Sequence, residues 1–203
     1  FLKSFLLFFD KNKFETYGIT LTDDKLIKDS SLELKNNFEN WLNLSKLNNQ
    51  EVINVLQNHK IEILVDLLGL FHADRIEIFN SRISPLQVSW LGYPNTVGFP
   101  NIDYLISDKN LIKDGEEKFY SEKILKLSKI WNCHSGFEFD RKLLEPPVKL
   151  NKHITFGSFN NFLKISNEVV EVWSEILKKT KNSKLILKSS LNVSNNIIYE
   201  KFE

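Results

Sequence analysis

The sequence of 203 residues contains one cysteine, Cys133, and no methionine. A single cysteine excludes an internal disulfide framework, and it fits the reducing conditions of the cytoplasm. The sequence also lacks any apolar run that approaches the ~20 residues of a membrane-spanning helix. Its apolar opening is interrupted by Lys3 and has neither a basic leader nor a small-residue cleavage site. These absences predict a cytoplasmic protein without membrane or secretory segments.

An excess of charge of either sign is also absent. The chain has 27 basic and 26 acidic residues, a net charge of +1, and so offers no broad electrostatic field for nucleic acid or anionic lipid. Hydrophobic side chains make up 42% of the sequence, enough for a substantial core in one large domain or in parts of two. The missing initial methionine, and an ending that reads as mid-helix, Y-E-K-F-E, predict a fragment of a longer protein.

Helix-like and strand-like patterns alternate along the first 127 residues. Helices are expected at residues 1–9, through Phe38 and Trp41 after a cap at Ser30 or Ser31, and through Val52, Val55 and Leu56 after a cap at Asn48 or Asn49. Strands are expected at residues 14–21, 61–68, 86–91 and 102–106, with a helical turn and an edge strand within residues 115–127. The run at 61–68 reads as a strand buried on both faces. This alternation predicts an α/β fold with a mostly parallel sheet.

The loop between the strands at 86–91 and 102–106 holds Gly92, Pro94, Gly98 and Pro100. Glycine lets the backbone approach a bulky neighbour and proline stiffens φ, so these residues predict a loop that is held in one shape. Ligands of such folds bind beyond the carboxyl ends of the strands. We therefore expect this loop and the turn that starts at Gly69, followed by a helix from about Asp74, to face one crevice. An ordinary corner without a ligand is the alternative interpretation.

Two histidines invite a chemical role. His72 lies in the turn after Gly69, where a histidine could act as acid or base, but a solvated loop side chain is the more ordinary interpretation. His134 follows Cys133, but adjacent side chains rarely ligate the same ion and the sequence has no second cysteine. No metal site is predicted.

The clearest break in the chain is Glu145-Pro146-Pro147, where we place a boundary between domains at residues 1–145 and 146–203. Beyond it the pattern restarts with a strand at 153–159, a helix capped by Ser166 and a strand at 184–187. This order is the first β-α-β unit of a second α/β domain.

The turn inside that unit, N-N-F-L-K-I-S, carries Asn160, Asn161 and Lys164 before a helix N-terminus. Free N–H groups and an ammonium both favour negative charge, so the combination suits a phosphate group. Asparagine-rich turns before helices are also common without any ligand, which remains the alternative.

Two long motifs resemble one protein family. The first is Q-V-S-W-L-G-Y-P-N-T-V-G-F-P-N-I-D-Y-L-I-S-D followed by Y-S-E-K-I-L-K-L, and the second is F-G-S-F-N-N-F-L-K-I-S-N-E-V-V-E-V-W-S-E-I-L. In this order they resemble the catalytic region of the protein O-linked N-acetylglucosamine transferases and their SPINDLY relatives, glycosyltransferase family 41. The likeness is close from residue 61 to residue 188 and loose before residue 61.

The resemblance implies a fold of the GT-B type, with two Rossmann-like domains of which the second is truncated here. It implies an inverting, metal-independent enzyme without a cofactor, which moves a sugar from a nucleotide-sugar donor to serine or threonine hydroxyls of proteins and usually follows tetratricopeptide repeats. By position, Leu91, Gly92 and Pro94 would line the sugar pocket. Asn161 and Lys164 would contact the nucleotide and its diphosphate, and Lys164 would stabilise charge on the leaving group.

The chain departs from the family pattern at Leu70 and Phe71, where the family usually has a histidine or tyrosine and then a threonine. Two further family segments would lie before Phe1 and after Glu203, so this fragment alone is expected to be inactive. Three hypotheses follow: transfer of N-acetylglucosamine from UDP-N-acetylglucosamine, transfer of fucose from GDP-fucose as in plant SPINDLY proteins, or nucleotide-sugar binding without turnover. The first of them is the leading hypothesis.

Overall fold

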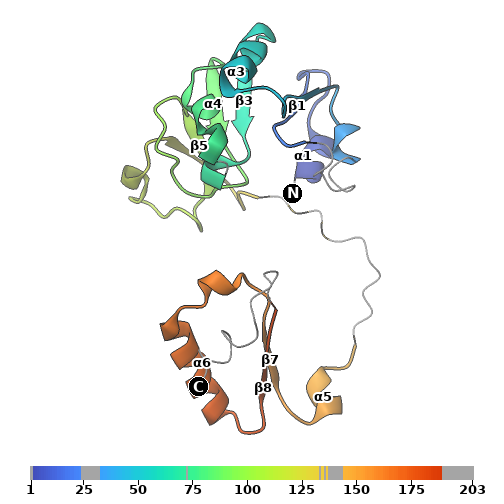
Figure 1. Ribbon diagram of the computed structural model, residues 1–203, viewed down its shortest axis with the longest axis vertical. Helices are drawn as coiled ribbons and strands as arrows, with labels where there is room; N and C mark the ends of the chain where they lie inside the picture. The colour runs from blue at the N-terminus through green and yellow to red at the C-terminus, as the bar shows by residue number, and fades with distance from the viewer. Residues whose placement is uncertain are drawn as a thin grey trace. The chain divides into compact units, whose positions relative to one another are not determined.

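The computed structural model describes residues 2–23, 33–71, 73–132, 134, 136 and 144–188. Its chain forms two compact units, Phe1–Phe137 and Glu138–Glu203 (Figure 1). Each unit contains parallel strands and helices of its own. The alternation of helices and strands confirms the predicted α/β class, while the domain boundary between residues 145 and 146 stays a prediction.

A pair of parallel strands precedes the main sheet of the first unit. β1 (Tyr17–Thr20) and β2 (Asn40–Asn43) follow α1 (Leu2–Phe8), and Gly18 pairs with Trp41. The predicted helix through Trp41 is therefore wrong, and its caps Ser30 and Ser31 lie outside the described residues. A side chain at Gly18 would start 2.4 Å from the Trp41 ring. The indole thus covers a strand position without a side chain, and this tertiary packing overrides the local helical pattern.

The main sheet of the first unit has four parallel strands. They are β3 (Ile63–Asp66), β4 (Leu86–Ser89), β5 (Tyr104–Asp108) and β6 (Lys123–Leu127), and they lie in the order β3-β4-β5-β6. A short helical turn, Glu117–Phe119, precedes β6, which forms one edge. The parallel sheet and the edge strand at its end are confirmed as predicted.

One face of this sheet carries the larger core of the first unit. α3 (Asn49–Asn58) starts at the predicted cap Asn48, whose side chain accepts a hydrogen bond from the Glu51 N–H at 2.9 Å. Side chains of α3, of α4 (Ile76–Asn80) and of β3 pack together on this face. The buried members of the cluster are Leu44, Val52, Ile53, Leu56, Leu64, Ile78 and Ile83.

The opposite face of β3 is open in the described part of the chain. Ile63 and Val65 are 46% and 40% exposed, whereas Leu64 between them is buried. The prediction of a strand buried on both faces is therefore wrong, because the helices that follow β2 and β3 cover only the Leu64 face. Phe5 of α1 packs edge-on against Trp90, the residue that follows β4, with ring centroids 5.6 Å apart.

The turn after β3 begins at Gly69 as predicted, but it continues further than expected. Two 3-10 turns, Gly69–Phe71 and Ala73–Arg75, precede α4, so the helix expected from Asp74 starts at Ile76. Arg75 ties this turn to the segment before α3, since its guanidinium donates to the Leu47 and Ser45 carbonyls at 2.9 and 3.2 Å. His72 lies outside the described residues.

The second unit contains the predicted β-α-β order. A short helix, α5 (Pro147–Asn151), precedes β7 (Thr155–Ser158), α6 (Asn167–Lys179) and β8 (Lys184–Leu187), and β7 pairs in parallel with β8. The predicted cap is confirmed, because the Ser166 hydroxyl accepts from the Val169 N–H at 3.4 Å. Pro147 is the first residue of α5, a place in the first helical turn that suits proline.

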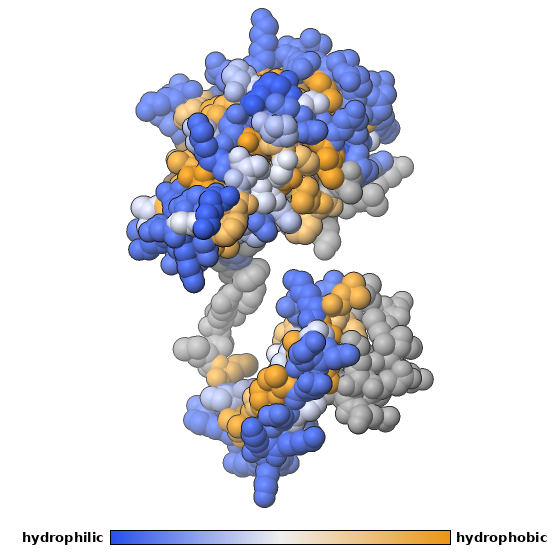
Figure 2. Space-filling view, turned by 90° about the vertical axis from the view of Figure 1, so that its left-hand side faces the viewer, coloured by the Kyte–Doolittle hydropathy of each residue, from blue (hydrophilic) through white to orange (hydrophobic). Residues whose placement is uncertain are grey.

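Hydrophilic residues cover much of the face shown in Figure 2, with hydrophobic surface in patches on both units. None of the helices in the described ranges is long and apolar enough to cross a lipid bilayer.

Candidate functional site

The last residues of β3 and β5 are two buried carboxylates. Asp66 and Asp108 are each 1% exposed. Asp66 accepts from the backbone N–H groups of Leu68 and Gly69, at 2.8 and 3.1 Å, and burial nevertheless raises its pKa. Burial also acts to raise the pKa of Asp108, but three backbone N–H groups, including that of Trp131 at 2.7 Å, together lower it. Both carboxylates therefore shape the loops at this edge of the sheet.

The two loops that were expected to face one crevice are in contact. The rings of Phe71 and Tyr93 meet edge to face, with centroids 5.5 Å apart. Gly69 has a positive φ of 56°, and a side chain there would start 2.4 Å from the Tyr93 Cβ. The contact places Leu70 and Phe71, which are 37% and 68% exposed, beside the predicted sugar loop, and a crevice shared by the two loops stays a prediction.

Leu91, the first predicted donor-binding residue, has an unusual backbone conformation. Its φ is +76°, and the Gly92 N–H donates to the Trp90 carbonyl at 3.0 Å across it. This is a tight γ-turn of the strained kind, which a bulky residue seldom adopts. Strained backbone of this kind concentrates at ligand-binding loops, so the turn supports a functional interpretation of the loop.

Gly92 and Pro94 occupy different environments within the same loop. A side chain at Gly92 would start 1.9 Å from the Leu67 carbonyl oxygen, just beyond β3. The glycine thus permits close packing of two protein backbones, since the Leu67 carbonyl lies where a side chain at this position would begin. Pro94 is exposed at the surface. The roles of Leu91, Gly92 and Pro94 in donor binding stay predictions.

The far half of this loop is fixed by a buried glutamate that the sequence analysis did not single out. Glu122, which precedes β6, is 4% exposed and accepts from the Val97 N–H at 2.8 Å and from the Thr96 hydroxyl at 2.7 Å. Val97 itself packs in a second core cluster with Phe79 and Ile102. The prediction of a loop held in one shape is confirmed. The available signal was a carboxylate directly before an apolar strand, in Y-S-E-K-I-L, where charge is costly unless it is paired.

The second unit presents the other candidate, the turn between β7 and α6. A 3-10 turn, Phe162–Lys164, is capped by Asn161, whose side-chain oxygen accepts from the Leu163 N–H at 3.0 Å. Phe162 and Ile165 are buried and anchor the turn to the core of this unit, while Asn161 and Lys164 are exposed. The buried neighbours thus hold both predicted residues on the outer side of one short turn.

The Lys164 ammonium has no ion pair in the described ranges of the chain, whereas Lys179 and Lys149 each meet a carboxylate four residues earlier in the sequence. The backbone N–H of Lys164 donates to the Asn161 carbonyl at 3.0 Å, so the two residues keep a fixed relation. A lysine ammonium without a carboxylate partner, next to a side-chain amide, is chemically suited to bind an anionic group. The structure brings Asn161 and Lys164 together, and their contact with a nucleotide stays a prediction.

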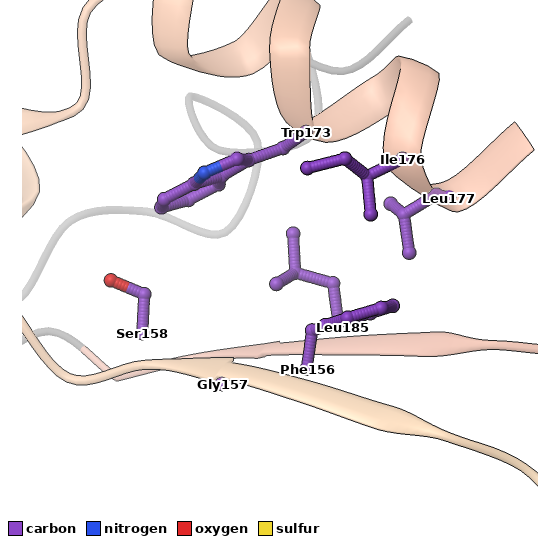
Figure 3. A pocket seen from close by; sticks show the side chains of 7 residues that line it. All are labelled: Phe156, Gly157, Ser158, Trp173, Ile176, Leu177 and Leu185. Carbon is purple, nitrogen blue, oxygen red and sulfur yellow. The ribbon is translucent and has the colours of Figure 1, made fainter. Parts of the chain in front are cut away.

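A pocket of about 180 Å³ lies between α6 and the β7-β8 pair in the same unit (Figure 3). Trp173, Ile176 and Leu177 of α6 face Phe156 and Leu185 of the strands, and Ser158 adds one hydroxyl. Such an apolar lining offers few groups that could orient a charged donor. We interpret it as part of the core of this unit.

Comparison with known proteins identifies the family. The model of the family described as "Glycosyl transferase family 41" matches residues 1–136. A rice protein described as a probable UDP-N-acetylglucosamine–peptide N-acetylglucosaminyltransferase SPINDLY is 33% identical over 165 residues, 81% of this chain and 17% of its own length. A barley SPINDLY protein is 32% identical over 171 residues, 84% of this chain and 18% of its own length. An Arabidopsis thaliana protein, described as a probable UDP-N-acetylglucosamine–peptide N-acetylglucosaminyltransferase SEC, is 31% identical over 157 residues. The match covers 73% of this chain and 16% of its own length.

A solved structure supports the fold. A mutant of the Thermobaculum terrenum O-GlcNAc transferase matches this chain with a TM-score of 0.83 and 24% identity, covering 100% of this chain and 38% of that chain. The match confirms the predicted α/β fold of the GT-B type, of which this chain contains a part. The chain spans less than a fifth of the length of these curated relatives. The family model, together with relatives above 30% identity over most of the sequence, shows that the chain belongs to glycosyl transferase family 41 and comes from its catalytic region.

Proposed function

We propose that the protein is a glycosyltransferase that moves a sugar from a nucleotide-sugar donor to serine or threonine hydroxyls of acceptor proteins. The observation that carries the proposal is the exposed turn with Asn161 and Lys164, which has the residue types and the anchored geometry suited to a diphosphate. Family membership supplies the reaction class, since the curated relatives are described as peptide N-acetylglucosaminyltransferases.

In the proposed reaction the acceptor oxygen forms a bond to the anomeric carbon and its hydroxyl proton passes to solvent, while the bond from that carbon to the diphosphate oxygen breaks. Negative charge then develops on the leaving nucleoside diphosphate. The Lys164 ammonium would stabilise this charge, and Asn161 would donate from its amide nitrogen, because its oxygen already accepts from the Leu163 N–H. The Leu91–Pro94 segment would line the sugar pocket. Metal-independent transfer, which the family resemblance implies, belongs to the same proposal.

The leading donor is UDP-N-acetylglucosamine, the donor in the descriptions of the curated relatives. GDP-fucose is the alternative, because the loop and turn motifs resemble SPINDLY proteins at least as much. Upstream tetratricopeptide repeats, protein acceptors and a cytoplasmic location belong to the same proposal.

A nucleotide-sugar-binding protein without turnover is a further candidate, and one observation favours it. Leu70 and Phe71 present apolar surface where the family usually has polar groups, and they lie beside the predicted sugar loop. Such a protein would bind a donor nucleotide but transfer no sugar to any acceptor.

The test is sugar transfer by the complete protein, with UDP-N-acetylglucosamine and GDP-fucose offered in parallel. We expect Lys164→Ala to lower kcat/KM by roughly a hundredfold or more, the effect of removing one transition-state charge contact of about 2.7–4 kcal/mol. Lys178→Ala is the matched control, since Lys178 is an exposed lysine at the end of α6, away from the turn.

Lysine-dependent transfer from one donor would establish the enzyme and name its sugar. Wild-type transfer that persists in Lys164→Ala would contradict the assignment of this lysine. Donor binding by calorimetry without any transfer would favour the binding protein.

A further inference from the structure

Glu122 is a buried carboxylate in the segment that precedes β6. It is 4% exposed, and in the part of the chain that the structure describes no lysine, arginine or histidine lies within ion-pair distance of it. Burial of an unpaired carboxylate is costly, and only hydrogen bonds to the charged form offset that cost. An apolar side chain at this position would avoid the cost. The glutamate is therefore explained by the loop residues that its hydrogen bonds fix in place.

Both oxygens of Glu122 are used by one loop. Oε1 accepts from the Val97 N–H at 2.8 Å, and Oε2 accepts from the Thr96 hydroxyl at 2.7 Å. The Thr96 oxygen in turn accepts from the N–H groups of Gly98 and Ser121, at 3.2 and 3.3 Å, and lies 3.0 Å from the Ser121 hydroxyl. Glu122 and Thr96 therefore form a small polar network, which we name the loop clamp.

The loop clamp fixes one end of a segment whose other end is fixed by backbone packing. At the first end, Leu91 makes the γ-turn and Gly92 lies against the Leu67 carbonyl. At the second end, Glu122 of the loop clamp accepts hydrogen bonds from Thr96 and Val97. The residues between these two anchors include Pro94 and Asn95, which are exposed. Loss of the clamp would free one end of this segment while leaving the sheet below it intact.

We propose that Glu122 is a positioning residue for donor binding, which acts through Thr96 and Val97 on the Leu91–Pro94 segment. The inference rests on the proposed function, since it takes this segment as the wall of the sugar pocket. Pre-ordering of a binding loop lowers the entropic cost of binding. Loosening it is therefore expected to weaken donor affinity more than it slows the chemical step.

Glu122→Gln tests the charge with little change of shape. Its amide oxygen can still accept from the Val97 N–H, but its NH₂ group would face the Thr96 hydroxyl and lose the charge-assisted contact. We expect the donor KM to rise about tenfold, the usual order for one hydrogen bond to a charged group, with kcat changed less than about threefold. Thr96→Val should have a similar effect, and the double variant should be no worse than the stronger single one, because both remove the same contact.

Glu116→Gln is the matched control. Glu116 also accepts from a backbone N–H, that of Lys113 at 2.8 Å, but it does not contact the loop. Its donor KM should equal that of the wild type. Hydrogen exchange in the complete protein without donor gives a second measurement: exchange at the Val97 and Gly98 amides should speed up in Glu122→Gln and remain at the wild-type rate in Glu116→Gln.

The outcomes separate the inference from the proposed function. A wild-type protein that binds neither UDP-N-acetylglucosamine nor GDP-fucose would contradict the proposed function, whatever the exchange rates. A wild-type protein that binds a donor, combined with an unchanged donor KM in Glu122→Gln, would overturn the positioning role alone. Faster loop exchange together with a raised donor KM would support it, whereas faster exchange with an unchanged KM would reduce Glu122 to a structural residue.

Discussion

At the scale of single residues, the strained backbone of Leu91 predicts that a glycine variant is more stable than an alanine variant, the reverse of the usual order. Leu91→Ala and Leu91→Gly both remove the side chain, but only glycine adopts a φ of +76° without steric cost. The left-handed conformation costs an L-residue about 1–2 kcal/mol, which exceeds the usual preference for alanine of about 0.5–1 kcal/mol. We therefore expect the glycine variant to be more stable by up to about 1 kcal/mol in urea denaturation.

Leu86 in β4 provides the control for this prediction, because it is a partly buried leucine in an ordinary strand conformation. There, the glycine variant should be less stable than the alanine variant. If alanine were also the better residue at position 91, the γ-turn would carry no strain.

The ion pair between Arg82 and Asp103 gives a prediction for pH. The guanidinium donates two hydrogen bonds to Asp103, at 2.7 and 3.0 Å, and together with the Gln87 N–H it lowers the pKa of this carboxyl although burial opposes the shift. A carboxyl with a lowered pKa in the folded protein stabilises it above the unfolded pKa, and this contribution is lost as the pH falls through the folded value.

We therefore expect Arg82→Met to lower the free energy of unfolding by about 1 kcal/mol at neutral pH, a value kept small because the arginine is partly exposed. The difference from the wild type should shrink as the pH is lowered from about 4 to about 2, because Asp103 becomes protonated in both proteins. Urea titrations across this range would show it. A difference that is independent of pH would contradict the electrostatic origin.

At the scale of elements, the order of strands and helices could be predicted, since it depends on patterns within single segments. The cap Asn48, the strand β5 and the β-α-β order around Ser166 all follow from local hydrophobic period and capping chemistry. Trp41 could not be placed in the same way, because its strand is stabilised by contact with Gly18, more than twenty residues earlier in the sequence.

The candidate site also has features that follow from local sequence and features that depend on distant contacts. Glycine and proline between two strands predicted a held loop, but its strained turn at Leu91 and its contact with Glu122 depend on neighbours that are distant in sequence. The partners of Asn161 and Lys164 are local, and here the sequence placed both residues on one turn, as the structure does.

The packing of the sugar loop on β3 can be tested with two glycines of the same loop. Alanine at Gly92 would place its Cβ 1.9 Å from the Leu67 carbonyl oxygen, so the backbone must shift, at a cost of about 1–3 kcal/mol. Alanine at Gly98 meets nothing within 4 Å. Its only cost is the φ of +73°, about 1 kcal/mol, and the more restricted unfolded chain offsets part of that cost. Thermal unfolding should rank Gly92→Ala as clearly less stable than Gly98→Ala, whereas equal stabilities would contradict the close approach of loop and strand.

At the scale of the whole molecule, the fold was predictable because two separated motifs occur in the order expected of one family. The alternation of helices and strands, which restarts after Pro147, by itself predicts two α/β domains, and the two compact units agree with it. The boundary placed at Glu145-Pro146-Pro147 stays a prediction, because a proline can mark a domain boundary and can also begin a helix, as Pro147 does in α5.

Each unit has a buried cluster of its own, so core substitutions are expected to act on the unit that contains them. Leu56 is 2% exposed in the larger cluster of the first unit, and Ile165 is 5% exposed in the cluster of the second. Alanine at either position should cost about 2–5 kcal/mol, from lost burial and the cavity left behind.

Hydrogen exchange resolved along the complete protein would locate these losses. Leu56→Ala should speed exchange in the strands β3 to β6 and leave β7, α6 and β8 at wild-type rates, while Ile165→Ala should do the reverse. Lys178→Ala, at an exposed lysine, and Glu116→Gln, at a partly exposed glutamate, serve as controls that change neither core. If either core variant raised exchange equally in both units, they would unfold as one cooperative structure, and the separate clusters would not define separate units of stability.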